Sequence, residues 1–155
     1  MAKIVIGSKA PSFNLPATGG EIFSLKSLKG KKVVLYFYPK DDTPGCTKEA
    51  CGFSDKRSEF LSANAEIVGV SKDSLAKHEK FKTKYDLHFE LASDEESETC
   101  EAYGVWKEKN MYGRKYMGIE RSTFLIDEKG IVRAEWRKVK VPGHVEAVLD
   151  ATKKL

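Results

Sequence analysis

The residue best placed to do chemistry is Cys46, which follows Thr43, Pro44 and Gly45. Threonine suits the N-cap of a helix, and proline suits the first helical position, where its missing N–H group costs nothing. Cys46 would then be the third helical residue, where unpaired backbone N–H groups and the positive end of the helix dipole favour a thiolate. Because the thiolate is the form that attacks, we expect a reactive cysteine; an ordinary half-buried helical cysteine is the alternative.

Cys51 lies five residues further along the same predicted helix. Five helical residues correspond to a rise of about 7.5 Å and a rotation of about 140°, so a disulfide with Cys46 requires local unwinding. Gly52 is less favourable than alanine inside a helix by about 1 kcal/mol and would ease that unwinding. We hypothesise that Cys51 resolves a sulfenic acid formed on Cys46; a buried small hydrophobic residue is the alternative.

Cys100 has different surroundings. It lies in the acidic stretch 95–101, EESETCE, and neighbouring negative charges disfavour a thiolate. We therefore expect Cys100 to have a structural or incidental role.

A zinc-binding module is the main non-enzymatic alternative. The sequence supplies ligand types in three cysteines and three histidines: Cys46, Cys51, Cys100, His78, His88 and His144. They do not form a zinc-finger pattern, in which two close cysteines are followed by a second close pair of ligands. We expect the histidines to lie on helix and strand surfaces, and we expect no metal site.

Two buried strands and a helix between them would position Cys46. Residues 32–38 (KVVLYFY) and 67–71 (IVGVS) are nearly continuous apolar runs, typical of strands covered on both faces of a sheet. A helix from Pro44 to about Leu61 would complete a βαβ unit. Sites in open α/β sheets lie beyond the carboxyl ends of strands, beside helix N-termini, which is where Cys46 falls.

The remaining pattern predicts a thioredoxin-like α/β fold in one domain, residues 1–155. Its central mixed sheet is flanked by helices and carries an N-terminal β-hairpin extension. The further elements expected are extended pieces at 13–15 and 21–23, a helix at 74–85, a strand near 89–91, a short helix at 97–103, a hairpin of 123–126 and 131–136, and a helix at 144–154. Fold alone does not assign a function.

Composition excludes several classes of function. The 155 residues are 41% hydrophobic and 32% charged, as in soluble globular proteins, and the net charge of +4 is spread along the chain. This balance predicts neither nucleic-acid binding nor disorder. Residues 1–8 show no secretory leader and no apolar run is long enough for a membrane span. We therefore expect a cytoplasmic protein whose thiols are reduced.

The motif Pro39-x-x-x-Thr43-x-x-Cys46 resembles the active-site motif of the peroxiredoxin family. The segment 43–53 (TPGCTKEACGF) is similar to the peroxiredoxin Q, or bacterioferritin comigratory protein, group. The likeness extends to residues 103–106 (YGVW) and 118–127 (GIERSTFLID), so it spans most of the chain.

The resemblance implies a role for each matching residue. Cys46 would be the peroxidatic cysteine and Cys51 the resolving cysteine that closes a disulfide within one helix. Thr43 and Arg121 would hold the thiolate and polarise the peroxide, with hydroxyl and guanidinium donors that stabilise developing charge. Pro39 would shield the pocket. The resemblance implies no role for Cys100, which lies outside the catalytic pattern.

The resemblance also implies a monomeric peroxidase that needs no metal, haem or other cofactor. Its substrates would be hydrogen peroxide and organic hydroperoxides, and its reductant thioredoxin or a similar dithiol. Two other functions remain open. A disulfide oxidoreductase of thioredoxin type would show C-x-x-C at this turn, whereas the chain has C-x-x-x-x-C. A thiol-based redox sensor or holdase would use the same Cys46 and would signal to a partner.

Overall fold

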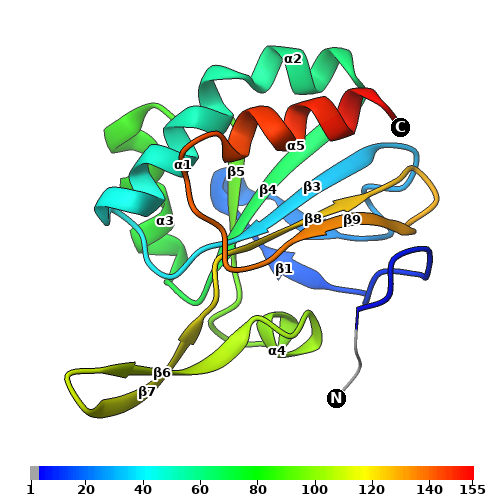
Figure 1. Cartoon of the computed structure of the whole chain (residues 1–155). Helices are drawn as coiled ribbons and strands as arrows, with labels where there is room; N and C mark the ends of the chain where they lie inside the picture. The colour runs from blue at the N-terminus through cyan, green and yellow to red at the C-terminus, as the bar shows by residue number, and fades with distance from the viewer. Residues whose placement is uncertain (1–3) are drawn as a thin grey trace.

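A five-stranded mixed sheet forms the centre of the computed structural model, which describes residues 4–155 (Figure 1). The strand order is β5-β4-β3-β8-β9; β3, β4 and β5 run parallel, and β8 and β9 continue the sheet antiparallel. The strands are β3 (Lys32–Phe37), β4 (Ala65–Ser71), β5 (Glu90–Ser93), β8 (Ser122–Ile126) and β9 (Val132–Trp136). Both faces of the sheet are covered, which explains why β3 is buried along its whole length.

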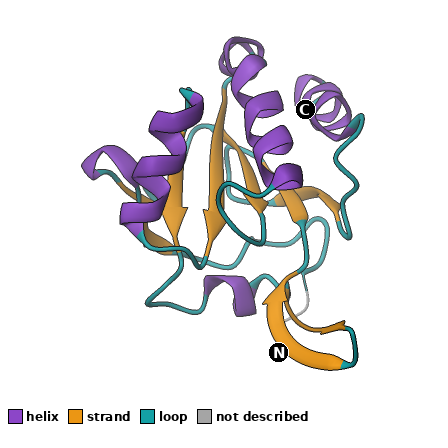
Figure 2. Ribbon diagram, turned by 90° about the vertical axis from the view of Figure 1, so that its left-hand side faces the viewer, coloured by secondary structure: helices purple, strands orange, loops and turns teal. Residues whose placement is uncertain are grey.

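Four helices cover one face of the sheet (Figure 2). They are α1 (Pro44–Asp55), α2 (Arg57–Ser62), α3 (Leu75–Tyr85) and α5 (His144–Lys153). Tyr36 of β3 points to this face and stacks on Phe53 of α1, with ring centroids 4.7 Å apart. Because side chains alternate along a strand, the neighbouring Leu35 and Phe37 point to the opposite face.

The helix expected from Pro44 to about Leu61 is interrupted at Lys56, and this prediction was wrong in its length. Lys56 leaves helical geometry with φ −99° and ψ 6°, so α1 ends and α2 begins. At this break Arg57 donates to the His88 carbonyl and to Glu66, the latter at 3.0 Å. These are contacts between distant segments, which a local sequence pattern does not reveal.

The opposite face of the sheet is covered by shorter elements. The predicted N-terminal hairpin is confirmed as β1 (Asn14–Pro16) and β2 (Ile22–Ser24), joined through the short helix η1 (Thr18–Gly20). The small helix α4 (Thr99–Ala102) packs on the same side through Cys100, and nearby Tyr103 lies 5.3 Å from the Phe37 ring. The expected architecture, a mixed sheet between helices with an N-terminal hairpin, is therefore confirmed.

A second hairpin was not predicted. Within the described part of the chain, strands β6 (Trp106–Met111) and β7 (Arg114–Ile119) pair only with each other, and they project from the body of the molecule (Figure 1). Most of their side chains are exposed or half-buried. Without a covered face there is no alternation of apolar and polar residues for the sequence to display.

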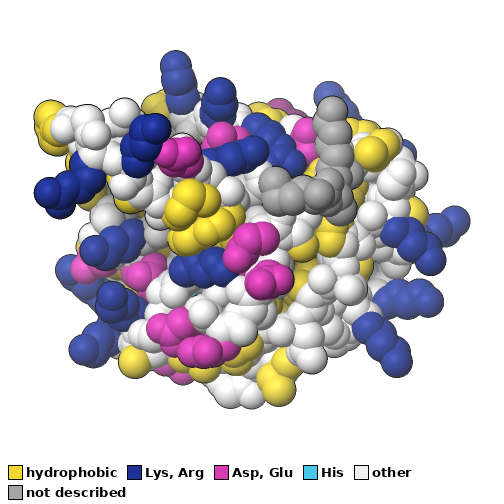
Figure 3. Space-filling model, turned by 90° about the horizontal axis from the view of Figure 1, so that it is seen from below, with side chains coloured by type: hydrophobic (Ala, Val, Ile, Leu, Met, Phe, Trp, Pro, Cys, Tyr) yellow, Lys and Arg dark blue, Asp and Glu magenta, His cyan; other side chains and the backbone are white. Residues whose placement is uncertain are grey.

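The surface agrees with the expectation of mixed charge. Seen from below, acidic and basic side chains are interspersed with apolar ones on that face (Figure 3). None of the helices within residues 4–155 is both long and apolar enough to cross a bilayer. Residues 1–3, which are part of the stretch 1–8 for which no secretory leader is expected, lie outside the described residues.

The fold brings two distant segments together at the carboxyl end of β3. Phe37, the last residue of β3, pairs with Ser122, the first residue of β8. The loop 39–43 then leads into α1, while Arg121 immediately precedes β8. The start of α1 and Arg121 therefore meet at the same edge of the sheet.

Candidate active site

The helix start predicted around Cys46 is confirmed. Thr43 is the N-cap of α1, with extended φ and ψ of −98° and 156°, and its carbonyl accepts from the Thr47 N–H at 2.8 Å. Pro44 is the first helical residue and Cys46 the third. As one of the first N–H groups of the helix, the Cys46 N–H has no carbonyl partner within α1. A negative charge on the Cys46 sulfur is favoured at this position.

Thr43 uses its hydroxyl differently from our expectation. The side chain does not cap the helix; instead Thr43 Oγ1 donates to the Lys40 carbonyl at 2.9 Å. The hydroxyl hydrogen is therefore engaged, whereas the oxygen lone pairs can still accept. In this arrangement the hydroxyl can accept from the O–H of a peroxide rather than donate to it.

Arg121 contacts Cys46 directly. Its Nη2 lies 3.3 Å from Cys46 Sγ, and the Cys46 side chain is only 1% exposed. The neighbouring Gly45 permits this approach, because a Cβ at position 45 would lie 3.1 Å from Nη2. The guanidinium is permanently charged and has several donors in a fixed fork, so it favours the thiolate.

Glu49 is part of this site, although it was not among the residues predicted from the sequence. Arg121 Nη1 donates to Glu49 Oε1 at 2.6 Å, and the Glu49 side chain is fully buried. Burial raises the pKa of Glu49 to about 7, against the opposing effect of Arg121. The available signal was spacing, since Glu49 follows Cys46 by three residues and so lies on the same helix face.

His144 lies behind Glu49 at the start of α5. Its Nε2 is 3.9 Å from Glu49 Oε2 and 2.8 Å from the hydroxyl of Thr123. Within residues 4–155, Glu49 Oε2 has no hydrogen-bond partner. Burial, together with the charge of Arg121, lowers the pKa of His144 to about 4. The prediction of a surface histidine was therefore wrong for His144, whereas His88 is exposed.

Cys51 lies on the same continuous helix as Cys46, as the sequence predicted, and all three cysteines are free. Cys51 is half-buried, and burial together with the nearby Asp55 raises its pKa. It lines a cavity of about 670 Å³ between α1, α2 and the end of α3. Gly52 also has a packing role that the sequence did not indicate, because a Cβ there would lie 3.0 Å from Val145 Cγ2.

Cys100 and Pro39 stand apart from these contacts. Cys100 is completely buried, its pKa is raised by burial, and its backbone N–H donates to Asp94 at 2.7 Å. A structural role is the one that these surroundings favour. Pro39 follows Tyr38 at the end of β3 with its side chain exposed, and its shielding role stays a prediction.

One group of side chains could offer metal ligands together within the described residues: Asp41, Asp73 and His78. It contains no cysteine, and each member already has a protein partner. His78 bonds Asp41 at 2.6 Å, and Asp73 accepts from the Ser71 hydroxyl at 2.7 Å. These donors and acceptors are satisfied without an ion. His78 is completely buried, so the prediction of a surface histidine was wrong here too.

Comparisons with known proteins agree with this geometry. The sequence model of the AhpC/TSA family matches residues 6–135. The chain belongs to that family. It is 59% identical to a putative peroxiredoxin Bcp of Coxiella burnetii over 146 residues, which cover 94% of this chain and 97% of the relative.

Two solved structures extend the comparison. Xanthomonas campestris bacterioferritin comigratory protein is 48% identical with a TM-score of 0.87, covering 92% of this chain and 90% of that one. Xylella fastidiosa PrxQ is 39% identical with a TM-score of 0.93, covering 99% and 98%. The chain is thus a thioredoxin-fold peroxiredoxin of the Q group, and its activity is that of a thiol-dependent peroxidase.

Proposed function

We propose that Cys46 is the peroxidatic cysteine of this peroxidase and that Thr43, Arg121 and Pro39 complete its pocket. The observation that carries the proposal is the 3.3 Å contact between Arg121 Nη2 and Cys46 Sγ in the first turn of α1. A fixed positive charge and a helix N-terminus both act on the same sulfur, and both favour the form that attacks.

In the first step the Cys46 sulfur attacks one oxygen of the peroxide, so that an S–O bond forms while the O–O bond breaks. The electron pair of the broken bond goes to the leaving oxygen, which takes up a proton and departs as water or an alcohol. Negative charge therefore develops on that oxygen. Arg121 and the Cys46 backbone N–H can donate to the reacting oxygens, while the Thr43 hydroxyl accepts from the peroxide O–H and orients it. Pro39 limits access of water.

In the second step Cys51 resolves the sulfenic acid on Cys46. The Cys51 sulfur attacks the Cys46 sulfur, an S–S bond forms, the S–O bond breaks, and the hydroxide takes up a proton and leaves as water. Because both residues lie on one helix, α1 has to unwind locally before their sulfur atoms can meet.

Thioredoxin or a similar dithiol then reduces the Cys46–Cys51 disulfide. One thiol of the reductant attacks the disulfide and its second thiol releases the reduced peroxidase, so the reductant leaves as a disulfide. The cavity of about 670 Å³ beside Cys51 supports this step, because it opens the resolving cysteine to solvent. Asp55 and Arg57 line it and supply charged groups for a partner.

The substrates are hydrogen peroxide and organic hydroperoxides, in an antioxidant role. The Xanthomonas relative has been studied for alkyl peroxide reduction, which supports extending that class to this chain. Residues 1–155 act as one domain, and the protein works as a monomer in the cytoplasm. Three free cysteines fit a compartment that keeps thiols reduced.

The test follows peroxide consumption with thioredoxin, its reductase and NADPH. Cys46→Ser should be inactive, Cys51→Ser should lose thioredoxin-driven turnover, and Cys100→Ser should stay near normal. After one equivalent of peroxide, the intact mass of wild type should fall by two hydrogens, whereas Cys51→Ser should gain one oxygen. Full turnover by Cys46→Ser would refute the assignment of the nucleophile, and a stable oxygen adduct in wild type would refute Cys51 as the resolver.

A further inference from the structure

The loop that precedes α1 is fixed by two consecutive carboxylates, Asp41 and Asp42. Asp42 has a left-handed backbone with φ 58°, so the two side chains point in different directions. Asp42 reaches outward to α3, where its oxygens accept from Lys84 at 2.7 Å and Tyr85 at 2.6 Å. Asp41 points inward and is only 9% exposed. Both carboxylates therefore attach the same short loop to α3.

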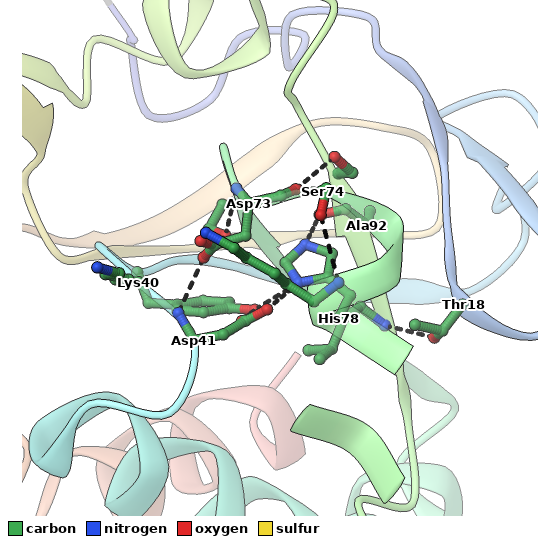
Figure 4. Close-up of polar contacts among 12 residues, drawn as sticks. Thr18, Lys40, Asp41, Asp73, Ser74, His78 and Ala92 are labelled. Carbon is green, nitrogen blue, oxygen red and sulfur yellow. Dashed lines mark hydrogen bonds and ion pairs between the residues drawn. The ribbon is translucent and has the colours of Figure 1, made fainter. Parts of the chain in front are cut away.

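The buried side of this attachment is a pair between Asp41 and His78. Asp41 Oδ2 lies 2.6 Å from His78 Nδ1, and Asp41 Oδ1 accepts from the Tyr38 hydroxyl at 2.6 Å (Figure 4). His78 Nε2 lies 3.0 Å from the Ala92 carbonyl on β5. A carbonyl only accepts, so Nε2 is the donor to Ala92. The imidazole thus joins the loop to β5 with both of its nitrogens.

Asp73 fixes the backbone of the same loop. Its Oδ2 accepts from the Asp41 N–H at 2.8 Å and from the Ser71 hydroxyl at 2.7 Å, and its carbonyl accepts from the Ser93 hydroxyl at 2.6 Å. In Figure 4, Asp41, Asp73 and His78 converge from the loop, the segment after β4 and helix α3. The ends of three neighbouring strands are therefore connected through one polar cluster.

The location of this cluster gives it a consequence for catalysis. Asp41 lies two residues before the N-cap Thr43 and five before Cys46. The peroxide reaction needs the first turn of α1 intact, because it requires the helix N-terminus and Arg121 around Cys46. The disulfide needs the opposite, since Cys46 and Cys51 meet only when α1 unwinds. An anchor immediately upstream of this turn affects both steps in opposite directions.

We propose that the Asp41–His78 pair is a positioning clamp that holds the first turn of α1 folded and so decides the fate of oxidised Cys46. This inference rests on the roles given to Cys46 and Cys51 in the proposed function. While the turn is folded, the sulfenic acid is out of reach of Cys51. A second peroxide molecule can then oxidise it, adding one oxygen to form a sulfinic acid while that peroxide is reduced to water or an alcohol. A tight clamp favours peroxide attack and overoxidation; a loose clamp favours the disulfide.

Two substitutions at position 78 separate the clamp from general packing. The amide nitrogen of asparagine occupies about the place of Nδ1, and that of glutamine about the place of Nε2. His78→Asn therefore keeps a donor to Asp41 and loses the bond to Ala92, whereas His78→Gln keeps the Ala92 bond and releases the loop. Tyr38→Phe is a milder variant that removes one hydrogen bond to Asp41 and leaves the ring packing. Asp94→Asn is the control for instability, since Asp94 is also a buried carboxylate but caps α4.

The experiment mixes reduced protein with increasing multiples of hydrogen peroxide in a single turnover, blocks remaining thiols, and counts disulfide and sulfinic acid by intact mass. For His78→Gln we expect the sulfinic fraction to fall about tenfold, because a change of about 1.4 kcal/mol in the balance between folded and unwound α1 raises the unwound population about tenfold. Peroxide should react more slowly by a smaller factor, because the folded turn is still the major form. Tyr38→Phe should shift both quantities in the same direction by a smaller factor. His78→Asn should recover most of the wild-type partition, and Asp94→Asn should leave the partition unchanged.

Three outcomes would overturn the clamp. The first is that His78→Gln and Tyr38→Phe both divide oxidised Cys46 between disulfide and sulfinic acid as wild type does. The second is that His78→Asn changes this partition as much as His78→Gln does. The third is that Asp94→Asn shifts the partition as much as His78→Gln does. If His78→Gln does not fold, Tyr38→Phe and His78→Asn still decide. Failure of the proposed function looks different, because wild type itself would then form neither product on Cys46.

Discussion

Arg121 Nη2 lies 3.3 Å from the sulfur of Cys46, although 75 residues separate the two in the chain. The other end of the same guanidinium holds Glu49 at 2.6 Å, so the side chain is fixed from two directions. A donor that is fixed before the reaction does not have to reorganise as charge develops. This preorganisation is the basis of the predictions that follow.

Replacing Arg121 by lysine should slow the reaction with peroxide strongly. Lysine keeps the charge but lacks the planar fork that reaches Glu49 and Cys46 together. We expect the second-order rate constant to fall about a hundredfold, as for loss of one preorganised donor. Stopped-flow measurement of thiol oxidation tests this. Arg133→Lys, at an exposed ion pair with Asp127, is the matched control and should react like wild type.

Gly45→Ala should separate stability from activity. Alanine is favoured over glycine in a helix by up to about 1 kcal/mol, so the free energy of unfolding should rise or hold. The new Cβ would lie 3.1 Å from Arg121 Nη2 and would displace the guanidinium by a few tenths of an ångström. We expect the peroxide rate to fall about fivefold because a donor is misplaced.

Gly52→Ala is the control on the same helix, with the opposite expectation. Its Cβ would lie 3.0 Å from Val145 Cγ2, where α1 packs on α5. Overpacking of this kind costs about 1–3 kcal/mol, so urea unfolding should show lower stability while Cys46 reacts with peroxide at the normal rate. An equal loss of rate in both glycine variants would contradict the role given to Gly45.

Glu49 should make the stability of the protein depend on pH. Burial raises its pKa from 4.5 to about 7, so between these values the unfolded chain is ionised while the folded chain keeps the proton. The stabilisation from Glu49 is therefore complete below about pH 4.5 and is lost as pH rises through about 7. The contribution of Glu49 to the free energy of unfolding should fall by about 3 kcal/mol over this range, at about 1.4 kcal/mol per pH unit.

Urea unfolding of wild type and Glu49→Gln across this range tests the prediction, because the variant has no proton to lose. The free energy of unfolding of wild type should fall relative to that of the variant between pH 4.5 and 7 and then level off. His144 has the opposite sign: its pKa is lowered to about 4, so its stabilisation is lost as pH falls from about 6.5 through 4. His144 is present in both wild type and Glu49→Gln, so its contribution to the free energy of unfolding cancels when the two proteins are compared. A constant difference across the range would contradict the assignment.

Cys100→Ser should change stability and leave the chemistry intact. Cys100 is completely buried in α4 beside Asp94, and burying a hydroxyl there in place of the thiol costs up to about 3 kcal/mol. Thermal unfolding should show a lower midpoint, while the peroxide rate should stay within about twofold of wild type because the residue contacts none of the reacting groups. A large loss of rate in folded Cys100→Ser would show that this thiol takes part in turnover.

The sequence by itself determined the parts of this protein that depend on local pattern. The apolar run of β3 predicted a strand covered on both faces, and Thr43 and Pro44 predicted a helix start that places Cys46 in the first turn. These features are written in consecutive residues, because strand burial and helix capping are set by side chains within a few positions. The resemblance over residues 118–127 added Arg121.

Only the tertiary structure decided which distant side chains meet at the site. Glu49, His144 and His78 are single polar residues in amphipathic helices, and helical periodicity cannot distinguish a buried polar partner from a solvated one. Their roles arise because pairing between β3 and β8 fixes Arg121 beside α1, and because α3 and α5 pack on the same face of the sheet. The hairpin β6–β7 was missed for a related reason, since strands without a covered face carry no apolar alternation.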